Sequence, residues 1–302
     1  MLIESPPTLS TDEVTERLLV IFKSSSYRPP RLPSVATELL ALSHDPEVSF
    51  EKFESLLERD ALLAGEVLGI ARSAYYARGR EVTSLRQALI RLGLKPLHNI
   101  VMMAAMNLRV FRCKAYGSYM ARLQKHAHAS AQLARMVAHY TPFPEEHVFL
   151  CGLLHDVGIA GILLALADVP RGRKPPPAEE LWDAIGSAHA VAGARMIEMW
   201  NLPEDVKLAV EAHHDIGLSG FDHPVAATVC VADALAAELD MGLVPAAAAA
   251  AYRGRPGSDA PPPLDANSPE MLGRAQQALG LSDRQMEAVR EEATEWAKAE
   301  AS

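Results

Sequence analysis

One segment of this chain limits the fold more than any other, because it places an ionisable pair inside a long apolar stretch. His155 and Asp156 are adjacent, and the residues around them from Val148 to Ala167 are almost all apolar. A helical stretch that is apolar on all sides is expected at the centre of a protein. Burying an imidazole and a carboxylate there costs free energy unless both groups are paired or bound to a cation. We therefore expect a buried central helix over 148–167 that carries a metal-binding pair.

The composition and the helix-start signals predict an all-α chain. Hydrophobic residues make up 49% of the 302 residues, which suffices for a large core, whereas aromatic residues make up only 6%. Leu and Ala dominate the apolar set, and this mixture favours helices over strands. Capping residues recur before apolar helical patterns, for instance Ser49, Ser84 with Gln87, and Ser282 with Gln285. We expect one large domain or two packed domains made of helices.

Breaks in the pattern divide the chain. From Leu97 to Tyr140 the sequence is nearly continuous helix, with an expected interruption near 116–118. The Pro-rich stretch 170–178 cannot be regular helix and should be an exposed loop. A second Pro/Gly-rich break covers 253–263, and short helices follow it from Ser268 onwards.

Further polar residues on apolar helices are candidate partners of the central pair. A helical bundle could bring them to His155 and Asp156, where they would hold one divalent ion or two ions bridged by the central carboxylate. Neutral imidazole and carboxylate suit Fe, Mn or Zn. The candidates are His126, His189, His213, His214 and Asp233.

The order His, His-Asp, His, His-His, Asp along the chain resembles the HD superfamily, and closely its HD-GYP and HDOD branches. The resemblance implies a multi-helix HD-superfamily bundle with an N-terminal helical subdomain. Carried over by position, His126 matches the first His, and His155 and Asp156 match the pair that names the superfamily. His189 matches the His of the His-x-x-x-Gly element, His213 and His214 match the His-His pair, and Asp233 matches the closing Asp. In the two-metal branch the Asp of the pair bridges the ions, which is the role implied for Asp156.

The N-terminal half resembles the HDOD branch in particular. The matching stretches are Leu32-Pro-Ser-Val-Ala, the run from His44 to Phe53, and Thr83-Ser-Leu-Arg-Gln-Ala-Leu-Ile-Arg-Leu-Gly93. We accordingly divide the chain into an N-terminal helix at 1–24, an HDOD domain at 25–242 and a C-terminal helical extension at 243–302. Within the domain, 25–118 is an N-terminal helical lobe and 119–242 is a lobe that carries the metal site.

Three departures from the phosphodiesterase and HDOD patterns concern residues other than the metal ligands. The active phosphodiesterase branch reads His-Asp-Ile-Gly-Lys, whereas Ile159 follows Gly158 here. A lysine at that place would contact phosphate. The Gly-Tyr-Pro element that should follow His214 is missing, and Arg72 stands where HDOD domains usually carry Asn. The residues that match the metal ligands are therefore all present, whereas the elements that would contact substrate are not.

These features leave two principal hypotheses for function. In the first, the chain is a stand-alone signalling or regulatory protein that binds a protein partner or a small nucleotide ligand, with a structural or vestigial metal site. In the second, it is a metal-dependent phosphohydrolase acting on a nucleotide or cyclic dinucleotide, with a water activated beside Asp156 and no further catalytic residue assigned. Oxygen chemistry or redox sensing at a di-iron centre is a third reading.

The charge and hydropathy of the sequence limit which partners and which cellular compartment we expect. The net charge is −9, and such a chain repels phosphate backbones, so nonspecific nucleic-acid binding is not expected. The first residues lack a basic flank and a long apolar core, and the apolar stretches at 100–106 and 159–167 are short for a bilayer. We expect a cytoplasmic protein that is not membrane-bound, of undetermined oligomeric state.

Overall fold

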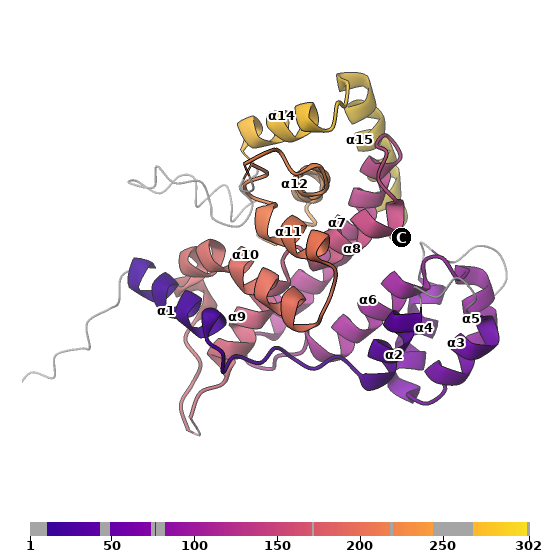
Figure 1. Ribbon diagram of the computed structural model, residues 1–302, viewed down its shortest axis with the longest axis horizontal. Coiled ribbons are helices and arrows are strands. Elements are labelled where there is room, and N and C mark those ends of the chain that lie inside the picture. Colours follow the sequence, from indigo (N-terminus) through magenta and orange to yellow (C-terminus); the bar gives the residue numbers. More distant parts are fainter. Residues whose placement is uncertain are drawn as a thin grey trace, which may run out of the picture.

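The computed structural model describes residues 11–42, 49–73, 76, 82–170, 172–217, 220–243 and 268–300. Every regular element within these ranges is helical, and they contain no strand (Figure 1). The all-α prediction is therefore confirmed. Part of the stretch from His44 and the whole Pro/Gly-rich break at 253–263 lie outside the described residues.

An N-terminal group of helices gathers at one end of the molecule (Figure 1). Two of these helices begin after predicted cap residues. The Ser49 hydroxyl accepts from the Lys52 amide, and the Ser84 hydroxyl accepts from the Gln87 amide. Gly93 ends its helix with φ 78°, a left-handed value that glycine adopts without strain. The helices are α2 (Ser34–Leu42), α3 (Phe50–Leu57), α4 (Ala61–Arg72), α5 (Leu85–Leu92) and α6 (Leu97–Arg109).

The remaining helices form a second group around the segment that contains His155 and Asp156. Helix α1 (Thr11–Lys23) packs on α10 of this group, while the C-terminal α14 and α15 pack on α12 and α7. The core of the group comprises α7 (Gly117–Ala138), α8 (Glu145–Leu154), α9 (Val157–Ala167), α10 (Trp182–Met199), α11 (Glu204–Ala212) and α12 (Pro224–Glu238). A 3₁₀ turn at Ala178–Glu180 precedes α10, and the C-terminal helices are α14 (Pro269–Ala278) and α15 (Asp283–Glu300).

The expected single helix over 148–167 is wrong, because two helices cover it. Helix α8 ends at Leu154 and α9 begins at Val157, and Asp156 between them leaves helical geometry with φ −101° and ψ 11°. The break lets adjacent side chains at 155 and 156 face the same site, which one continuous helix would direct about 100° apart. The span Glu145–Ala167 is long and apolar enough to cross a membrane, yet 89% of its most apolar stretch is buried inside the protein.

The interruption in the stretch 97–140 lies slightly earlier than predicted. Helix α6 ends at Arg109, where the amides of Val110 and Phe111 both bond to the Met106 carbonyl, and α7 begins at Gly117. The expected irregular loop at 170–178 is confirmed for its described residues, which contain no helix before Ala178.

Candidate metal centre

All seven residues predicted as metal ligands come together inside the second group of helices. His126 comes from α7, His155 and Asp156 from the α8–α9 junction, and His189 from α10. His213 and His214 follow the end of α11, and Asp233 lies on α12. Six of the side chains are buried and His214 is partly exposed. That these residues bind metal stays a prediction at this stage.

Three of the ligands form one coordination set, here called half-site 1. The Nε2 atoms of His126 and His155 are 3.2 Å apart, and the His126 Nε2 atom lies 3.2 Å from Asp233 Oδ1. The Oδ2 atom of Asp156 lies 3.3 Å from the Nε2 atom of each of these two histidines. Half-site 1 therefore comprises His126, His155 and Asp233, with one oxygen of Asp156.

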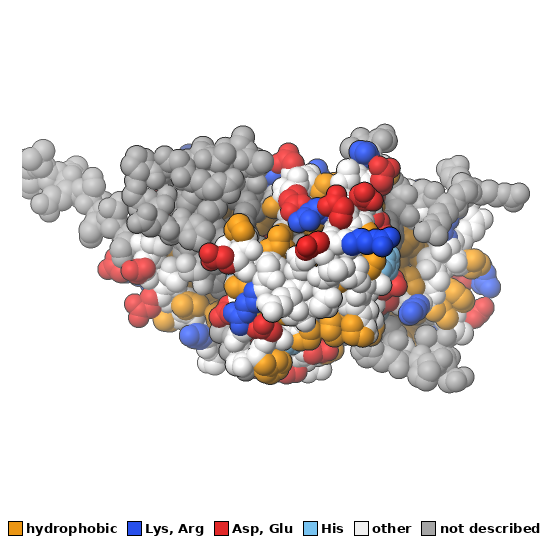
Figure 2. All heavy atoms as spheres, turned by 90° about the horizontal axis from the view of Figure 1, so that it is seen from above, with side chains coloured by type: hydrophobic (Ala, Val, Ile, Leu, Met, Phe, Trp, Pro, Cys, Tyr) orange, Lys and Arg blue, Asp and Glu red, His pale blue; other side chains and the backbone are white. Residues whose placement is uncertain are grey.

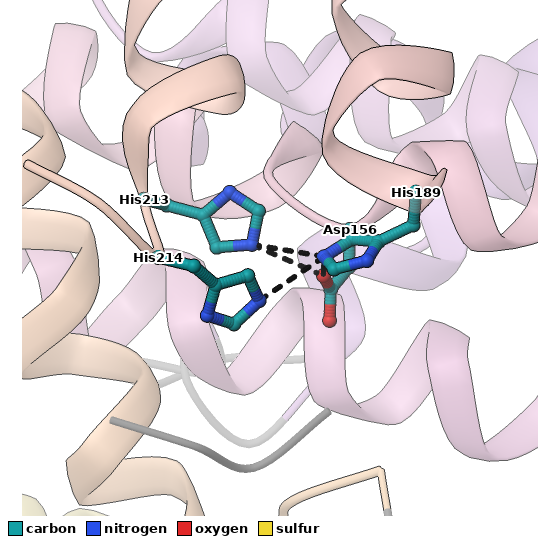
Figure 3. Close-up of side chains that lie close together, drawn as sticks. All are labelled: Asp156, His189, His213 and His214. Carbon is teal, nitrogen blue, oxygen red and sulfur yellow. Dashed lines mark hydrogen bonds and ion pairs between the residues drawn. The ribbon is translucent and has the colours of Figure 1, made fainter. Parts of the chain in front are cut away.

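The other three histidines form half-site 2 on the opposite side of the same carboxylate (Figure 3). The Nε2 atom of His189 lies 3.2 Å from that of His213 and 3.1 Å from that of His214. The second carboxylate oxygen, Asp156 Oδ1, lies 3.3 Å from His189 Nε2 and 3.5 Å from His213 Nε2. Asp156 thus offers one oxygen to each half-site, which is the arrangement of a bridging ligand.

Backbone carbonyls fix which nitrogen of four rings carries the proton. The Nδ1–H groups of His155, His189 and His213 each donate to a carbonyl three residues earlier, at 2.8, 2.6 and 2.6 Å. His126 Nδ1–H donates to the Met241 carbonyl at 3.1 Å. In the neutral tautomer this leaves Nε2 as a lone pair directed at the centre, which is the form that coordinates a metal.

The donor set fits divalent ions. Unprotonated Nε2 atoms at 3.1 to 3.2 Å repel one another unless a cation lies between them. Ligand atoms bound tetrahedrally at about 2.1 Å from one ion are about 3.4 Å apart, which matches the spacing within each half-site. Asp156 Oδ1 is buried and receives no hydrogen bond from any described residue. A bound cation would satisfy this oxygen.

The two half-sites differ in charge. Burial opposes protonation of His126, but its contacts with Asp156 and Asp233 outweigh burial and raise its pKa to about 10. In half-site 2 burial lowers the pKa of His213 and, more strongly, that of His214. Burial would raise the pKa of Asp156, yet the surrounding histidines hold it well below its usual range. The carboxylates of half-site 1 therefore keep His126 protonated when no metal is bound, whereas His213 and His214 in half-site 2 stay neutral.

Glycines allow α9 and α10 to approach closely enough to position His189. A Cβ atom at Gly158 would lie 1.9 Å from the His189 carbonyl oxygen and 2.5 Å from the Gly193 amide nitrogen. The backbones of the two helices therefore touch at this point, two residues after Asp156 and at the carbonyl of His189 itself. Sequence reasoning identified the His-x-x-x-Gly element without this reason for its glycine.

The remaining described histidines lie outside the cluster. His223 caps α12 by accepting the Ala226 amide, and His147 pairs with Asp205 at 3.2 Å between Nε2 and Oδ2. His128 lies in the wall of a separate cavity of about 270 Å³ together with Trp296. Sequence reasoning missed the carbonyl partners of the ligands, because backbone acceptors leave no signal in residue identity.

Family membership follows from a match over most of the chain. A model of the HDOD domain matches residues 30–216. The chain belongs to the HDOD family. An uncharacterized protein of Treponema pallidum (strain Nichols) is 26% identical over 216 residues, which cover 68% of this HDOD chain and 41% of that protein. A ribonuclease Y of Sulfurovum sp. (strain NBC37-1) is 30% identical over 149 residues, which cover 49% and 24%. The chain thus spans less than half the length of either relative.

Solved structures share the whole fold of this HDOD protein. An HDOD domain protein of unknown function from Geobacter sulfurreducens aligns over 96% of this chain and 97% of its own, with a TM-score of 0.65 and 23% identity. A Shewanella amazonensis SB2B protein assigned as a metal-dependent phosphohydrolase aligns over 93% and 99%, with a TM-score of 0.63 and 20% identity. Likeness at these identities concerns the fold, since function lies in the site that a fold carries.

The position of the motif lysine is occupied by a buried apolar side chain. Ile159 is 1% exposed and belongs to the hydrophobic core. None of the hydrogen bonds and ion pairs of Asp156 involves a lysine or an arginine among the described residues. The centre therefore combines a complete set of metal donors with no cation at the place where the active branch holds phosphate.

Proposed function

We propose that this chain is a metal-binding regulatory protein of the HDOD family that acts by binding a signalling protein or a small nucleotide ligand in the cytoplasm. The observation that carries the metal centre is the pair of ligand sets that share the two oxygens of Asp156. Two divalent ions, with Fe, Mn or Zn as candidates, would connect five segments of the second helix group. Metal occupancy would then control the rigidity of the surface offered to a partner.

The binding reading is favoured over catalysis by what surrounds the ligands. A phosphohydrolase needs cations or amides that offset charge on the transferring group beyond the metal itself. Here Ile159 is buried at the lysine position, and no Gly-Tyr-Pro element follows His214. On the face shown in Figure 2, described basic side chains are interspersed with acidic ones and do not form a continuous basic stripe. This face therefore lends no support to a nucleic-acid partner.

Phosphate-ester hydrolysis is the second candidate, and the bridging carboxylate favours it. Two ions held on either side of one Asp would supply Lewis-acid polarisation of a phosphoryl group. The partly exposed side of the centre is at His214, so a substrate would approach half-site 2. His214 stays neutral because burial lowers its pKa, and the neutral imidazole is the form that coordinates a metal at this side.

One experiment separates the two functions. Protein purified without chelators or added metal is analysed by elemental mass spectrometry, and turnover of a chromogenic phosphodiester and of cyclic dinucleotides is measured with Mn²⁺. Asp156→Ala is the site variant, and Asp168→Ala, an exposed carboxylate directly after α9, is the control.

We expect about two ions per chain in the wild type and in Asp168→Ala, and none in Asp156→Ala. We further expect equal, background turnover in all three proteins. Metal-dependent turnover that disappears only in Asp156→Ala would replace the regulatory proposal by hydrolysis. Wild-type protein without bound metal, even after incubation with Fe²⁺, Mn²⁺ or Zn²⁺, would contradict the centre itself.

A further inference from the structure

The C-terminal extension, to which sequence analysis assigned no role, reaches the metal centre through a short turn. Helix α12 ends at Glu238, and residues 239–243, here called the α12 turn, follow it. Helix α14 packs on α12 and α15 packs on α7. The Arg290 side chain on α15 contacts Glu238 at 3.2 Å between Nε and Oε2. The turn therefore follows directly on the end of α12 that contacts the extension.

The α12 turn holds one metal ligand directly. His126 Nδ1–H donates to the Met241 carbonyl at 3.1 Å, whereas His155, His189 and His213 each donate to a carbonyl three residues earlier in the chain. The acceptor of His126 is 115 residues away along the chain. The tautomer of this ligand thus depends on tertiary structure, and those of the other three depend on local structure.

A second side chain of α7, Arg122, also binds the turn. Arg122 lies one helical turn before His126, and its Nε–H donates to the Gly242 carbonyl at 2.8 Å. Its guanidinium also lies 3.8 Å from the Asp240 carboxylate. The turn is ordered by its own contacts. The Met241 amide bonds to the Ala236 carbonyl on α12 at 2.8 Å, and Leu243 is buried. Asp240 has a left-handed φ of 55°. Arg122 and His126 therefore donate hydrogen bonds to consecutive carbonyls of one ordered turn.

We propose that Arg122 is a positioning residue for half-site 1: it holds the Met241 carbonyl against His126 and so couples metal binding to the docking of the C-terminal extension. The proposal rests on the metal centre proposed above. Partners of a metal-bound histidine typically change metal affinity by 10- to 100-fold when removed. The coupling is reciprocal, so an ion that orders His126 also stabilises the turn and the helices beyond it.

The test isolates each half-site by removing a ligand of the other. In a His189→Ala background half-site 1 remains, and in a His155→Ala background half-site 2 remains. Co²⁺ affinity is measured from visible absorption in both backgrounds, with and without Arg122→Ala. We expect Arg122→Ala to weaken Co²⁺ binding about 10- to 100-fold in the His189→Ala background and to leave it unchanged in the His155→Ala background.

Two variants distinguish positioning from general damage to the fold. Arg122→Lys keeps the charge and a donor near the Gly242 carbonyl, and it should restore part of the affinity. Asp240→Asn removes the charge of the 3.8 Å ion pair, and Asn tolerates the left-handed φ, so this variant should bind Co²⁺ like the parent. Long-range ¹H–¹⁵N spectra of the histidines report the population of the His126 Nδ1–H tautomer. This population should fall in Arg122→Ala and not in the other two variants.

The reciprocal effect is read by hydrogen exchange on the full chain. Zn²⁺ should slow exchange in 235–243 and 268–300 in the wild type, and this slowing should be lost in Arg122→Ala. Equal Co²⁺ affinity with and without Arg122, while His189→Ala still binds metal, would overturn the coupling and leave the metal centre intact. Absence of binding in the wild type and both backgrounds would instead contradict the centre.

Discussion

At the residue scale, Asp156 has the role that no other side chain can replace. Its two oxygens face different half-sites, and its carboxylate is the one negative group that both sets of histidines share. The other acidic ligand, Asp233, contacts half-site 1 alone. Removing either acid therefore has different consequences, because Asp156 contributes an oxygen to both half-sites and Asp233 contributes to one.

Replacing the two carboxylates should reveal this asymmetry. Asp156→Asn should remove both ions, whereas Asp233→Asn should remove the ion of half-site 1 and retain the other. The reason is that Asn at 156 takes an anionic ligand from both half-sites, whereas Asn at 233 takes one from half-site 1 alone, and a site that loses an anionic ligand binds divalent ions more weakly. Elemental analysis of each variant after dialysis gives the ratio of ions per chain. Equal losses in both variants would contradict the division into half-sites.

Metal binding at half-site 1 should release protons. His126 has a pKa raised to about 10, because its contacts with Asp156 and Asp233 outweigh the effect of burial, so it is protonated at neutral pH without metal. An ion must displace that proton, and its affinity should rise as the pH increases from 7 towards 10. Calorimetry in the His189→Ala background, in buffers with different ionisation enthalpies, measures the protons released. A heat independent of the buffer would contradict this protonation state.

At the element scale, the site depends on how closely two helices approach. Backbone contact between α9 and α10 at Gly158 places His189 beside Asp156, which begins the same turn of α9. A side chain at Gly158 would have to separate the helices, because backbone atoms cannot move aside as the end of a flexible side chain can. Half-site 2 would then be distorted more than half-site 1, whose ligands lie on α7, the α8–α9 junction and α12.

Alanine substitutions at two glycines should have opposite effects. Gly158→Ala should lower the free energy of unfolding by about 1 to 3 kcal/mol, as overpacking typically does. It should also weaken metal binding at half-site 2. Gly69→Ala on α4 meets no atom within 4 Å, so it should stabilise the protein by about 0.5 to 1 kcal/mol through helix propensity. Denaturant unfolding checks both, and a Gly158→Ala protein as stable as the parent would refute the backbone contact.

The sequence predicted the elements better than their junctions. The caps at Ser49 and Ser84 depend on neighbouring residues, so local pattern was sufficient to find them. The break at His155 and Asp156 has no Pro or Gly to mark it, because it is imposed by the need of both side chains to face one site. The seven ligands were found as polar residues on apolar helices, and their order then matched a family pattern. The contact of His126 with Met241, 115 residues apart, was beyond any local pattern.

At the scale of the whole molecule, the centre connects five segments that are far apart in sequence. Its ligands come from α7, the α8–α9 junction, α10, the residues after α11, and α12, while none comes from the N-terminal helices α2 to α6. Ions in both half-sites would therefore stabilise one part of the molecule selectively. The other part, which carries most of the features that resemble HDOD domains specifically, has its own buried residues such as Phe53, Leu57 and Leu63.

Removal of metal should therefore loosen the molecule unevenly. An ion present at 100 times its dissociation constant contributes about 2.7 kcal/mol to stability, and a chelator should remove this contribution from each occupied half-site. Hydrogen exchange should quicken in α10, the segment after α11 and α12, while α3 and α5 stay unchanged because no ligand is attached to them. Asp156→Ala should exchange like the chelated wild type and respond little to chelator. A uniform increase across α3 and α5 would mean that both helix groups unfold as one unit, and metal occupancy could then not alter one surface while leaving the other intact.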